Sequence, residues 1–201
     1  MFFLYGSAEI ECLKSKDARL AEVIDKIGHI DRPVDTDLFS SVVHHIIGQQ
    51  ITTRAQQTIW QRMRASFGEV TPVSIGNASA AELQSFGMTF RKAEYIKDFS
   101  QKILNSEFDL GAVEQMPDAD AIAVLSSIKG IGIWTAEMIL LFCLQRPDIF
   151  SYNDLAIHRG MRMVYHHRKI SKKLFEKYRR RLSPCHYPQW SYTALSPDRW
   201  R

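Results

Sequence analysis

The sequence predicts an all-α protein that folds as two helical lobes with a cleft between them. Apolar residues recur at helical spacing along most of the chain, and capping residues precede several of these stripes. No segment shows the apolar–polar alternation of a half-buried strand, and no internal repeat or low-complexity segment is present. The 201 residues are enough for one large domain or two small lobes with a substantial core.

The predicted helices follow one another in chain order with connections of ordinary length. The first stripe begins after the capping residue Asp37 and ends at Gly48, and the next helix runs from about Thr53 to Gly68. Further helices are predicted near residues 80–87, 93–103, 118–128, 133–144, 155–165 and 172–182. The segment 133–144 is almost wholly apolar, so we expect its helix to be central and buried.

These helices form two predicted lobes of one functional unit, residues 1–201. The first lobe spans about residues 38–140, with a helical hairpin over 119–144 at its edge. The second lobe combines residues 1–37 with 141–201, so the N-terminal segment and the basic C-terminal part flank the middle block of helices.

Positive charge is concentrated in one segment. The chain has a net charge of +4, yet residues 159–181 hold ten lysines and arginines against one acid, Glu176. That segment is therefore +9 and the rest of the chain is −5. Such a basic region indicates either a polyanionic partner or a solvated helix face, and charge alone does not decide between them.

Composition excludes several protein classes. No apolar run approaches the roughly 20 residues of a membrane span, and the start of the chain lacks the basic region of a signal peptide. The three cysteines are far apart, odd in number and outside any Cys-x-x-Cys pair. The sequence therefore predicts no disulfide framework, no zinc ribbon and no iron–sulfur cluster. We expect an intracellular, cytoplasmic protein with no membrane partner.

Residues 125–138 read LSSIKGIGIWTAEM and place two glycines between helical segments. Glycine costs about 1 kcal/mol against alanine inside a helix, so Gly130 and Gly132 favour a tight turn between two helices. The amides from Gly130 to Ile133 would then lie at a helix N-terminus, which is a ready site for a phosphate, and Lys129 adds a positive charge beside it. A plain corner with a glycine cap is the alternative, and the two glycines alone do not decide.

Three sequence blocks resemble the helix-hairpin-helix superfamily of DNA glycosylases. LSSIKGIGIWTAEM resembles its hairpin, SYNDLAIHRGM its later loop with an aspartate, and FSSVVHHIIGQQITTRAQQTIW its early helix pair. The blocks keep the family order and spacing over about residues 38–165. The sequence is most similar to the 3-methyladenine DNA glycosylase II family in its compact form, without the N-terminal β-rich domain. The resemblance implies a helix-hairpin-helix motif and a DNA- and base-binding cleft between the lobes.

The resemblance places Asp154 in the catalytic role. Breaking the bond between deoxyribose and base develops positive charge on the sugar, which a carboxylate stabilises while it helps to orient or deprotonate water. Asp154 lies just before a predicted helix, whose N-terminal amides would keep the carboxylate ionised. The alternative is that Asp154 merely caps this helix, and both roles can coexist.

Trp134 stands where superfamily members with lyase activity carry a lysine that forms a Schiff base with the sugar. The resemblance therefore implies a monofunctional hydrolase that leaves an abasic site. An electron-rich ring attracts a cationic alkylated purine, so Trp134, and less strongly Tyr152, are candidates for the base pocket. Core packing is the alternative for Trp134. Lys129 occupies the turn position where the family usually has proline, so it does not replace the missing lysine.

The remaining expected contacts are with DNA. The target base must leave the stack, and the resemblance places the inserting wedge at Gln50, with Gln49 beside it, although an ordinary loop with exposed amides is the alternative. Arg159 and Arg162 lie one and two turns into the helix after Asp154 and are expected to reach phosphates near the flipped nucleotide.

The family hairpin also holds a monovalent cation through main-chain carbonyls. The matching positions are Ser126, Ile128 and Ile131, so the resemblance implies a structural sodium or potassium ion and no other cofactor. The implied partner is double-stranded DNA that contains damaged bases, bound by a monomer that would associate with the nucleoid in a bacterium. The sequence departs from its relatives after Pro184.

The leading hypothesis is a monofunctional DNA glycosylase for alkylated purines of the 3-methyladenine type. A glycosylase for another lesion, such as uracil or an oxidised or mismatched base, is a second enzymatic hypothesis. A non-catalytic binder of bent or damaged DNA is the third, and the aspartate at the family spacing favours the enzyme over it.

Overall fold

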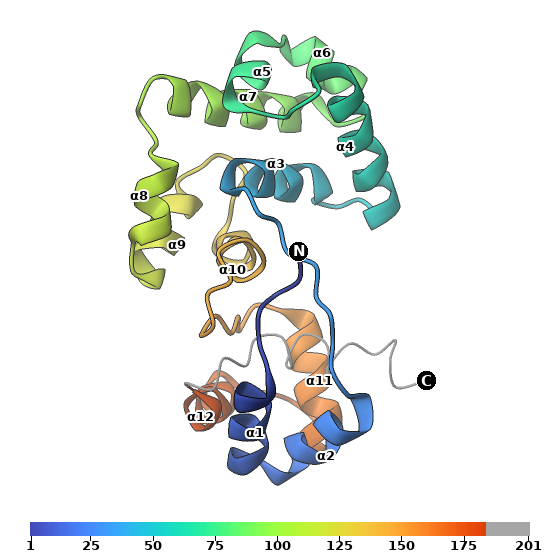
Figure 1. The fold of residues 1–201 in the computed structure, drawn as a ribbon, viewed down its shortest axis with the longest axis vertical. Coiled ribbons are helices and arrows are strands. Elements are labelled where there is room, and N and C mark those ends of the chain that lie inside the picture. The colour runs from blue at the N-terminus through green and yellow to red at the C-terminus, as the bar shows by residue number, and fades with distance from the viewer. Residues whose placement is uncertain (184–201) are drawn as a thin grey trace. The chain divides into compact units, whose positions relative to one another are not determined.

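The computed structural model describes residues 1–183, and this part of the chain is helical, as predicted (Figure 1). Within these residues the only β pairing is an isolated antiparallel bridge between Phe2 and Pro33. The predicted departure of the sequence after Pro184 lies outside the described residues. No helix in residues 1–183 has both the length and the apolar character needed to cross a bilayer.

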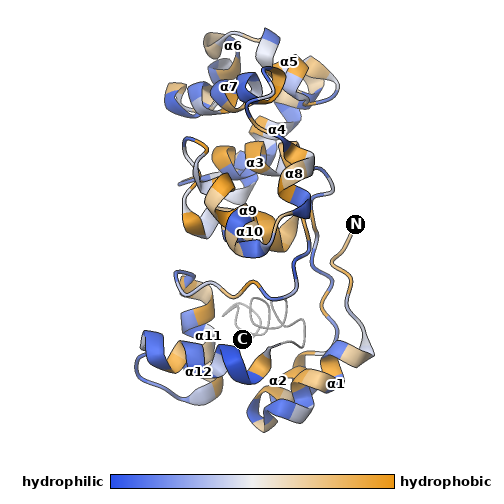
Figure 2. Cartoon of the chain, turned by 90° about the vertical axis from the view of Figure 1, so that its left-hand side faces the viewer, coloured by the Kyte–Doolittle hydropathy of each residue, from blue (hydrophilic) through white to orange (hydrophobic). Residues whose placement is uncertain are grey.

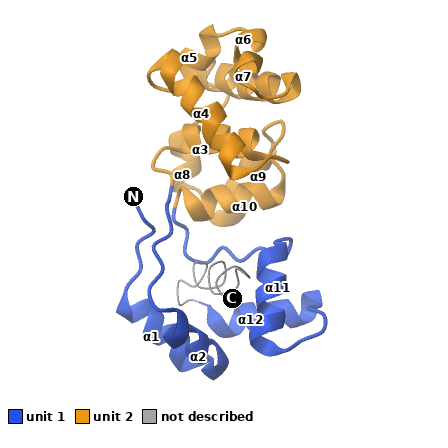
Figure 3. Cartoon of the chain, turned by 90° about the vertical axis from the view of Figure 1, so that its right-hand side faces the viewer, with its two compact units in different colours: residues 1–34, 145–201 blue, residues 35–144 orange. Residues whose placement is uncertain are grey.

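The chain divides into two compact units (Figure 3). Unit 1 is discontinuous in sequence and comprises Met1–Val34 and Gln145–Arg201. Unit 2 is the continuous segment Asp35–Leu144, and its two ends meet, because the Asp35 N–H donates to the Phe142 carbonyl at 2.9 Å.

Unit 1 packs two N-terminal helices with two helices from the later part of the chain. They are α1 (Ser7–Lys16), α2 (Ala18–Ile27), α11 (Leu155–Tyr165) and α12 (Lys172–Leu182). Helix α2 contacts α1 and α11, and α1 also contacts α12. Most of α12 is hydrophilic, as Figure 2 shows, and its apolar side buries Phe175, Tyr178 and Leu182. The basic residues of α12 therefore form its solvent side.

Unit 2 is built from eight helices. They are α3 (Leu38–Gly48), α4 (Thr53–Phe67), α5 (Pro72–Asn77), α6 (Ala80–Ser85), α7 (Phe90–Leu104), α8 (Leu110–Gln115), α9 (Asp118–Ser126) and α10 (Ile133–Phe142). Helix α3 contacts α4, α7 and α10, and α9 packs on α10. Phe39 of α3 stacks on Phe99 of α7 with ring centroids 5.5 Å apart, and both side chains are buried. Helix α3 thus lies at the centre of this unit's core.

The predicted burial of the segment 133–144 is wrong at its start. The body of α10 is buried, but Ile133 is 59% and Trp134 43% exposed. The helix begins at the turn of a hairpin, and burial starts at its third residue, since Thr135 and Ala136 are already buried.

One cysteine also differs from expectation. Cys143 is free and buried, and burial raises the pKa of its thiol to about 12. Cys12 is disulfide-bonded, which the scattered cysteines of the sequence did not predict.

Candidate functional site

The predicted hairpin is present, and its turn needs a glycine at position 130 for two reasons. Helices α9 and α10 flank the turn, which is closed by the Ile131 N–H donating to the Ile128 carbonyl at 3.0 Å. Gly130 has φ +88°, a conformation that L side chains rarely adopt. A Cβ at this position would also lie 2.5 Å from Cδ2 of Tyr95 on α7. The aromatic ring therefore fills the space that a side chain would need.

Gly132 has a different role, because it begins α10. It is the N-cap residue, with φ −95° and no side-chain cap, and an added Cβ would meet no atom within 4 Å. The first amides of a helix have no partner within that helix. Ile133 and Trp134 are exposed, so the N-terminus of α10 lies at the surface of the part of unit 2 that surrounds it. The base-pocket role of Trp134 and its alternative role in core packing both stay predictions.

Lys129 lies on the exposed side of the turn, where it is paired with an acid. Its Nζ is 2.8 Å from Oδ1 of Asp98, and Lys102 lies 3.7 Å from the other carboxylate oxygen. The hydrogen bond and charge of Asp98 raise the pKa of Lys129. Lys129 stays charged, but Asp98 offsets part of the positive charge that it adds to the hairpin.

The α3–α4 loop, with the predicted wedge residues, is tied to this hairpin. The Gln49 side chain donates from Nε2 to the Gly130 carbonyl at 2.6 Å, so its amide points to the hairpin turn. Gln50 is exposed and has φ +57°, in the left-handed region. Lys92 of α7 donates from Nζ to the carbonyls of Ile47 at 2.8 Å and Gln49 at 2.5 Å. The loop that presents Gln50 is therefore held from two sides.

Sequence reasoning missed Lys92 and Tyr95, which position the loop and the hairpin turn. Burial lowers the pKa of Lys92, as expected for an ammonium group that serves backbone carbonyls rather than solvent. Both residues lie on α7, where they read as ordinary helix residues, and no local signal marks their contacts with segments far away in sequence.

Asp154 caps α11 in unit 1 and is buried, with an exposed fraction of 6%. Its Oδ1 accepts the N–H groups of Ala156 at 2.7 Å and Ile157 at 3.0 Å. The capping role that the sequence left open is thus present. It uses Oδ1 and fixes the carboxylate at the positive end of the helix dipole.

Tyr152 belongs to an aromatic cluster next to this cap. Its ring contacts His158 and Phe175 edge-on, with centroids 4.8 and 5.2 Å apart, and Nε2 of His158 lies 2.6 Å from the Tyr152 carbonyl oxygen. The side chain is half-buried. These contacts hold the loop that leads into Asp154, and the base-pocket role of Tyr152 stays a prediction.

Arg159 and Arg162 lie on the exposed face of α11, where they line a cavity of about 580 Å³ with residues of the turn that follows the helix.

The predicted site residues are divided between the two units. Unit 2 brings the wedge loop and the hairpin together, and unit 1 carries Tyr152, Asp154 and both arginines on one loop and helix.

The carbonyls of Ser126, Ile128 and Ile131 are of the right chemistry for a hard monovalent cation. The last carbonyls of α9 have no partner within the helix, and that of Ile128 already accepts the Ile131 N–H. Main-chain oxygens at the end of a helix suit such an ion, and the bound sodium or potassium ion stays a prediction. Elsewhere in residues 1–183, no three histidine, cysteine or acidic side chains gather in a way that could hold a metal.

The two glycines provide a matched pair of variants. We expect Gly130→Ala to lower the free energy of unfolding by about 1–3 kcal/mol, because it combines an unfavourable φ with a contact against the Tyr95 ring. Gly132→Ala should change it by less than about 1 kcal/mol, since its φ is ordinary and the space is open. Urea unfolding of both variants measures the difference. Equal stabilities would show that the turn does not depend on Gly130.

Comparison with known proteins agrees with these features. Residues 43–185 match the family described as HhH-GPD superfamily base excision DNA repair protein. DNA-3-methyladenine glycosylase 1 of Schizosaccharomyces pombe is 27% identical over 141 residues, covering 68% of this chain and 62% of the relative. DNA-3-methyladenine glycosylase of Bacillus subtilis is 27% identical over 140 residues, 64% of this chain and 46% of the relative. This chain thus spans about half the length of these curated relatives.

A solved structure with a similar fold also carries the name of a DNA-3-methyladenine enzyme. The crystal structure of a DNA-3-methyladenine glycosidase from Bacillus halodurans superposes with a TM-score of 0.85, at 27% sequence identity, and the match covers 100% of this chain and 95% of that one. The family match includes the α9–α10 hairpin, the α3–α4 loop and the segment with Asp154. The chain therefore belongs to the HhH-GPD superfamily of base excision DNA repair proteins.

Proposed function

We propose that the protein is a monofunctional DNA glycosylase that hydrolyses the N-glycosidic bond of alkylated purines of the 3-methyladenine type in duplex DNA and leaves an abasic site. The family supports base excision, and the names of the relatives favour alkylated bases. The observation that carries the proposal is Asp154, a buried carboxylate fixed as the cap of α11 at the family position.

Asp154 supplies the chemistry in this proposal. As the glycosidic bond breaks, the sugar gains oxocarbenium character, and a fixed carboxylate stabilises that charge without having to reorganise. The capping bonds to Ala156 and Ile157 hold the carboxylate in place before the substrate binds. The same carboxylate orients or deprotonates the attacking water.

Trp134 supports hydrolysis without lyase chemistry. A lyase needs an amine to form a Schiff base with the sugar, and an indole has none. The exposed ring stands at the first turn of α10. We assign it to the base pocket, because a tryptophan face attracts the positive charge of an N-alkylated purine, a contact worth about 0.5–2 kcal/mol.

The hairpin and the α3–α4 loop provide the DNA contacts. The N-terminus of α10, from Gly132 to Trp134, suits a phosphate group. The predicted monovalent cation at the end of α9 and the ammonium group of Lys129 add positive charge beside it. Gln50 is the proposed wedge, since Gln49 is engaged with Gly130. The proposed partner is duplex DNA with damaged bases, which a monomer of the protein binds. Binding takes place in the compartment that holds the chromosome, which in a bacterium is the cytoplasm.

Base release from methylated duplex DNA tests the proposal. We expect free 3-methyladenine to be released, and the DNA strand to stay intact until alkali or heat cleaves it at the abasic site. Parallel duplexes with uracil, 8-oxoguanine or a mismatch test the choice of lesion. If base is released only from one of these duplexes, the enzyme acts on that lesion and not on alkylated purines. Strand cleavage without alkali would exclude a monofunctional enzyme. Binding without any base release would identify a non-catalytic DNA binder.

A further inference from the structure

The exposed face of α11 carries a stripe of basic residues that ends in a cavity. Arg159, Arg162, Met163 and His166 are spaced i, i+3, i+4 and i+7, so they share one side of the helix. Helix α11 ends at Tyr165, and the φ of +55° at its C-cap residue, His166, turns the chain. This turn brings in two more basic side chains, and the cavity of about 580 Å³ is lined by Arg159, Arg162, Met163, His166, His167 and Arg168.

The cavity is cationic because none of its lining residues is an acid. Within residues 1–183 the structure records no ion pair for Arg159, Arg162 or Arg168. Other arginines of unit 1 differ: Arg179 is paired with Glu176 and Arg181 with Asp17. The three arginines of the cavity thus have no acidic partner among residues 1–183. Arg19 and Arg180, outside the cavity, also lack one, but their guanidinium groups donate to the carbonyls of Tyr165 and Glu176.

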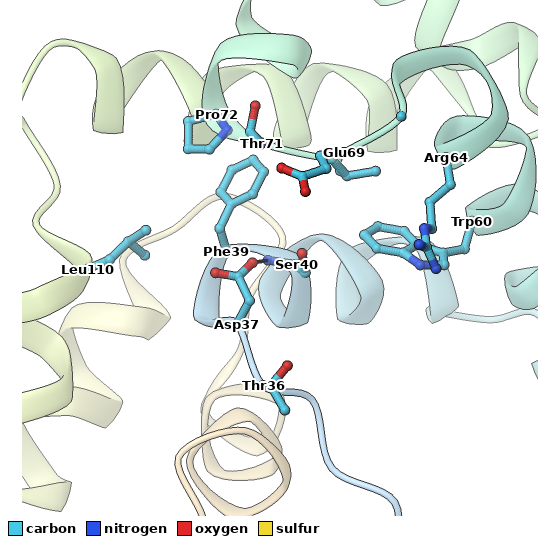
Figure 4. Close-up of a pocket in the computed structure, with 12 residues that line it drawn as sticks. Thr36, Asp37, Phe39, Ser40, Trp60, Arg64, Glu69, Thr71, Pro72 and Leu110 are labelled. Carbon is cyan, nitrogen blue, oxygen red and sulfur yellow. Dashed lines mark hydrogen bonds between the residues drawn. The ribbon is translucent and has the colours of Figure 1, made fainter. Parts of the chain in front are cut away.

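A cavity of similar size in unit 2 has a different character. It holds about 550 Å³, and the carboxylates of Asp37 and Glu69 share its lining with Arg64 (Figure 4). Both signs of charge are present there, so that cavity does not select anions. The α11 cavity therefore differs from this cavity of unit 2 in the charge of its lining.

Stabilisation of α11 explains only part of the stripe. A cation in the last turn interacts favourably with the helix dipole, which accounts for Arg162. It does not account for Arg159, which lies in the middle of the helix, or for Arg168, which lies beyond it. His167 is held in place by a 2.8 Å contact between its Nε2 and the Tyr178 hydroxyl, so the turn presents a fixed surface.

We propose that the α11 cavity, formed by Arg159, Arg162, His166, His167 and Arg168, binds phosphates of the DNA backbone away from the damaged nucleotide. Guanidinium groups form a planar fork that matches phosphate oxygens. From Arg159 to His166 the stripe rises about 10 Å along the helix. B-DNA presents a phosphate about every 3.4 Å of axis on each strand, so the stripe is long enough to face more than one phosphate.

This inference rests on the proposed function for its choice of polyanion. The stripe begins five residues after Asp154 on the same helix, so DNA that places a lesion at Asp154 has its backbone close to the first arginine. From Arg159 the cavity extends to the other end of the helix, away from Asp154. Its contacts therefore add affinity that does not depend on the sequence or on damage.

The salt dependence of DNA binding tests the inference. Binding of an undamaged duplex is measured at several salt concentrations for the unmodified protein and for Arg162→Gln, Arg168→Gln and the double variant. Each phosphate contact contributes about 0.9 to the slope of log K against log salt. We expect each single variant to reduce the slope by about 0.9, and the double variant by about 1.8. The matched control is Arg180→Gln, an exposed arginine of α12 outside the cavity, which should leave the slope unchanged.

Two results would overturn the inference. If the slopes of the cavity variants equal that of the unmodified protein, the cavity does not bind DNA, and an acidic protein partner becomes the alternative. If Arg180→Gln lowers the slope as much as they do, the effect reflects net charge rather than a site. A failure of the proposed function is distinct: the unmodified protein would release no base, whereas the slopes on undamaged DNA would still differ between the variants.

Discussion

Asp154→Asn is expected to reduce base release by at least about 10²-fold while the protein stays folded. Asparagine caps helices as well as aspartate does, so its side-chain oxygen can keep the bonds to the Ala156 and Ile157 amides. What it lacks is the negative charge that stabilises the developing positive charge on the sugar. Single-turnover release of the base at saturating enzyme measures this loss directly.

Two further variants separate catalysis from capping. Asp154→Ala removes both the charge and the cap and should also cost about 1 kcal/mol of stability. Asp109 caps α8 in the same way, with its carboxylate accepting the Ala112 N–H at 3.0 Å, so Asp109→Asn is the matched control and should keep full activity. If Asp154→Asn released base at the rate of the unmodified protein, Asp154 would be a cap and nothing more.

Asp17→Ala is expected to lower the free energy of unfolding by about 2–4 kcal/mol. The Asp17 side chain is only 2% exposed, and its Oδ2 accepts Nη1 of Arg181 at 2.7 Å and the Tyr165 hydroxyl at 3.1 Å. Its Oδ1 accepts the Leu20 N–H at 3.0 Å and caps α2. Arg181 is 40% exposed and can turn to water, so most of the loss comes from the cap and the buried hydroxyl.

Thermal unfolding measures this effect, at roughly 2–4 °C for each kcal/mol in a chain of this length. Burial, followed by the charge of Asp17, raises the pKa of Tyr165, so the hydroxyl stays protonated and donates to the carboxylate. The matched control is Asp25→Ala, which removes an ion pair with Lys14 in which Asp25 is 62% exposed. It should change stability by less than about 1 kcal/mol. Equal losses in the two variants would show that the buried network contributes nothing specific.

Local signals in the sequence predict the longer helices well. Helix α3 has a capping aspartate, a buried stripe and a final glycine, and the structure places it at Leu38–Gly48. Four helices were not predicted: α1, α2, α5 and α8. Helices α5 and α8 have six residues each, too few for a periodic pattern, and α1 buries only Leu13. Helix α2 did carry a signal, since Leu20, Val23 and Ile24 follow the capping Asp17.

The candidate site shows where local reasoning ends. The glycine pattern predicted the hairpin, but the need for Gly130 comes from Tyr95, which lies 35 residues earlier and reaches the turn only in the folded unit. In the same way, the sequence could suggest Gln49 and Gln50 as wedge residues. It could not show that the Gln49 amide bonds to Gly130 or that Lys92 holds the loop, because both contacts depend on tertiary packing.

The discontinuous sequence of unit 1 has a consequence for synthesis on the ribosome. Every helix of unit 2 has been synthesised once Leu144 is added, so that unit can complete its core before unit 1 does. Helices α1 and α2 are made first but must wait for α11 and α12, and the bond between Asp17 and Arg181 closes over 164 residues. The part of the protein that holds Asp154 is thus the last to assemble, so a nascent chain acquires its hairpin before it acquires its proposed catalytic residue.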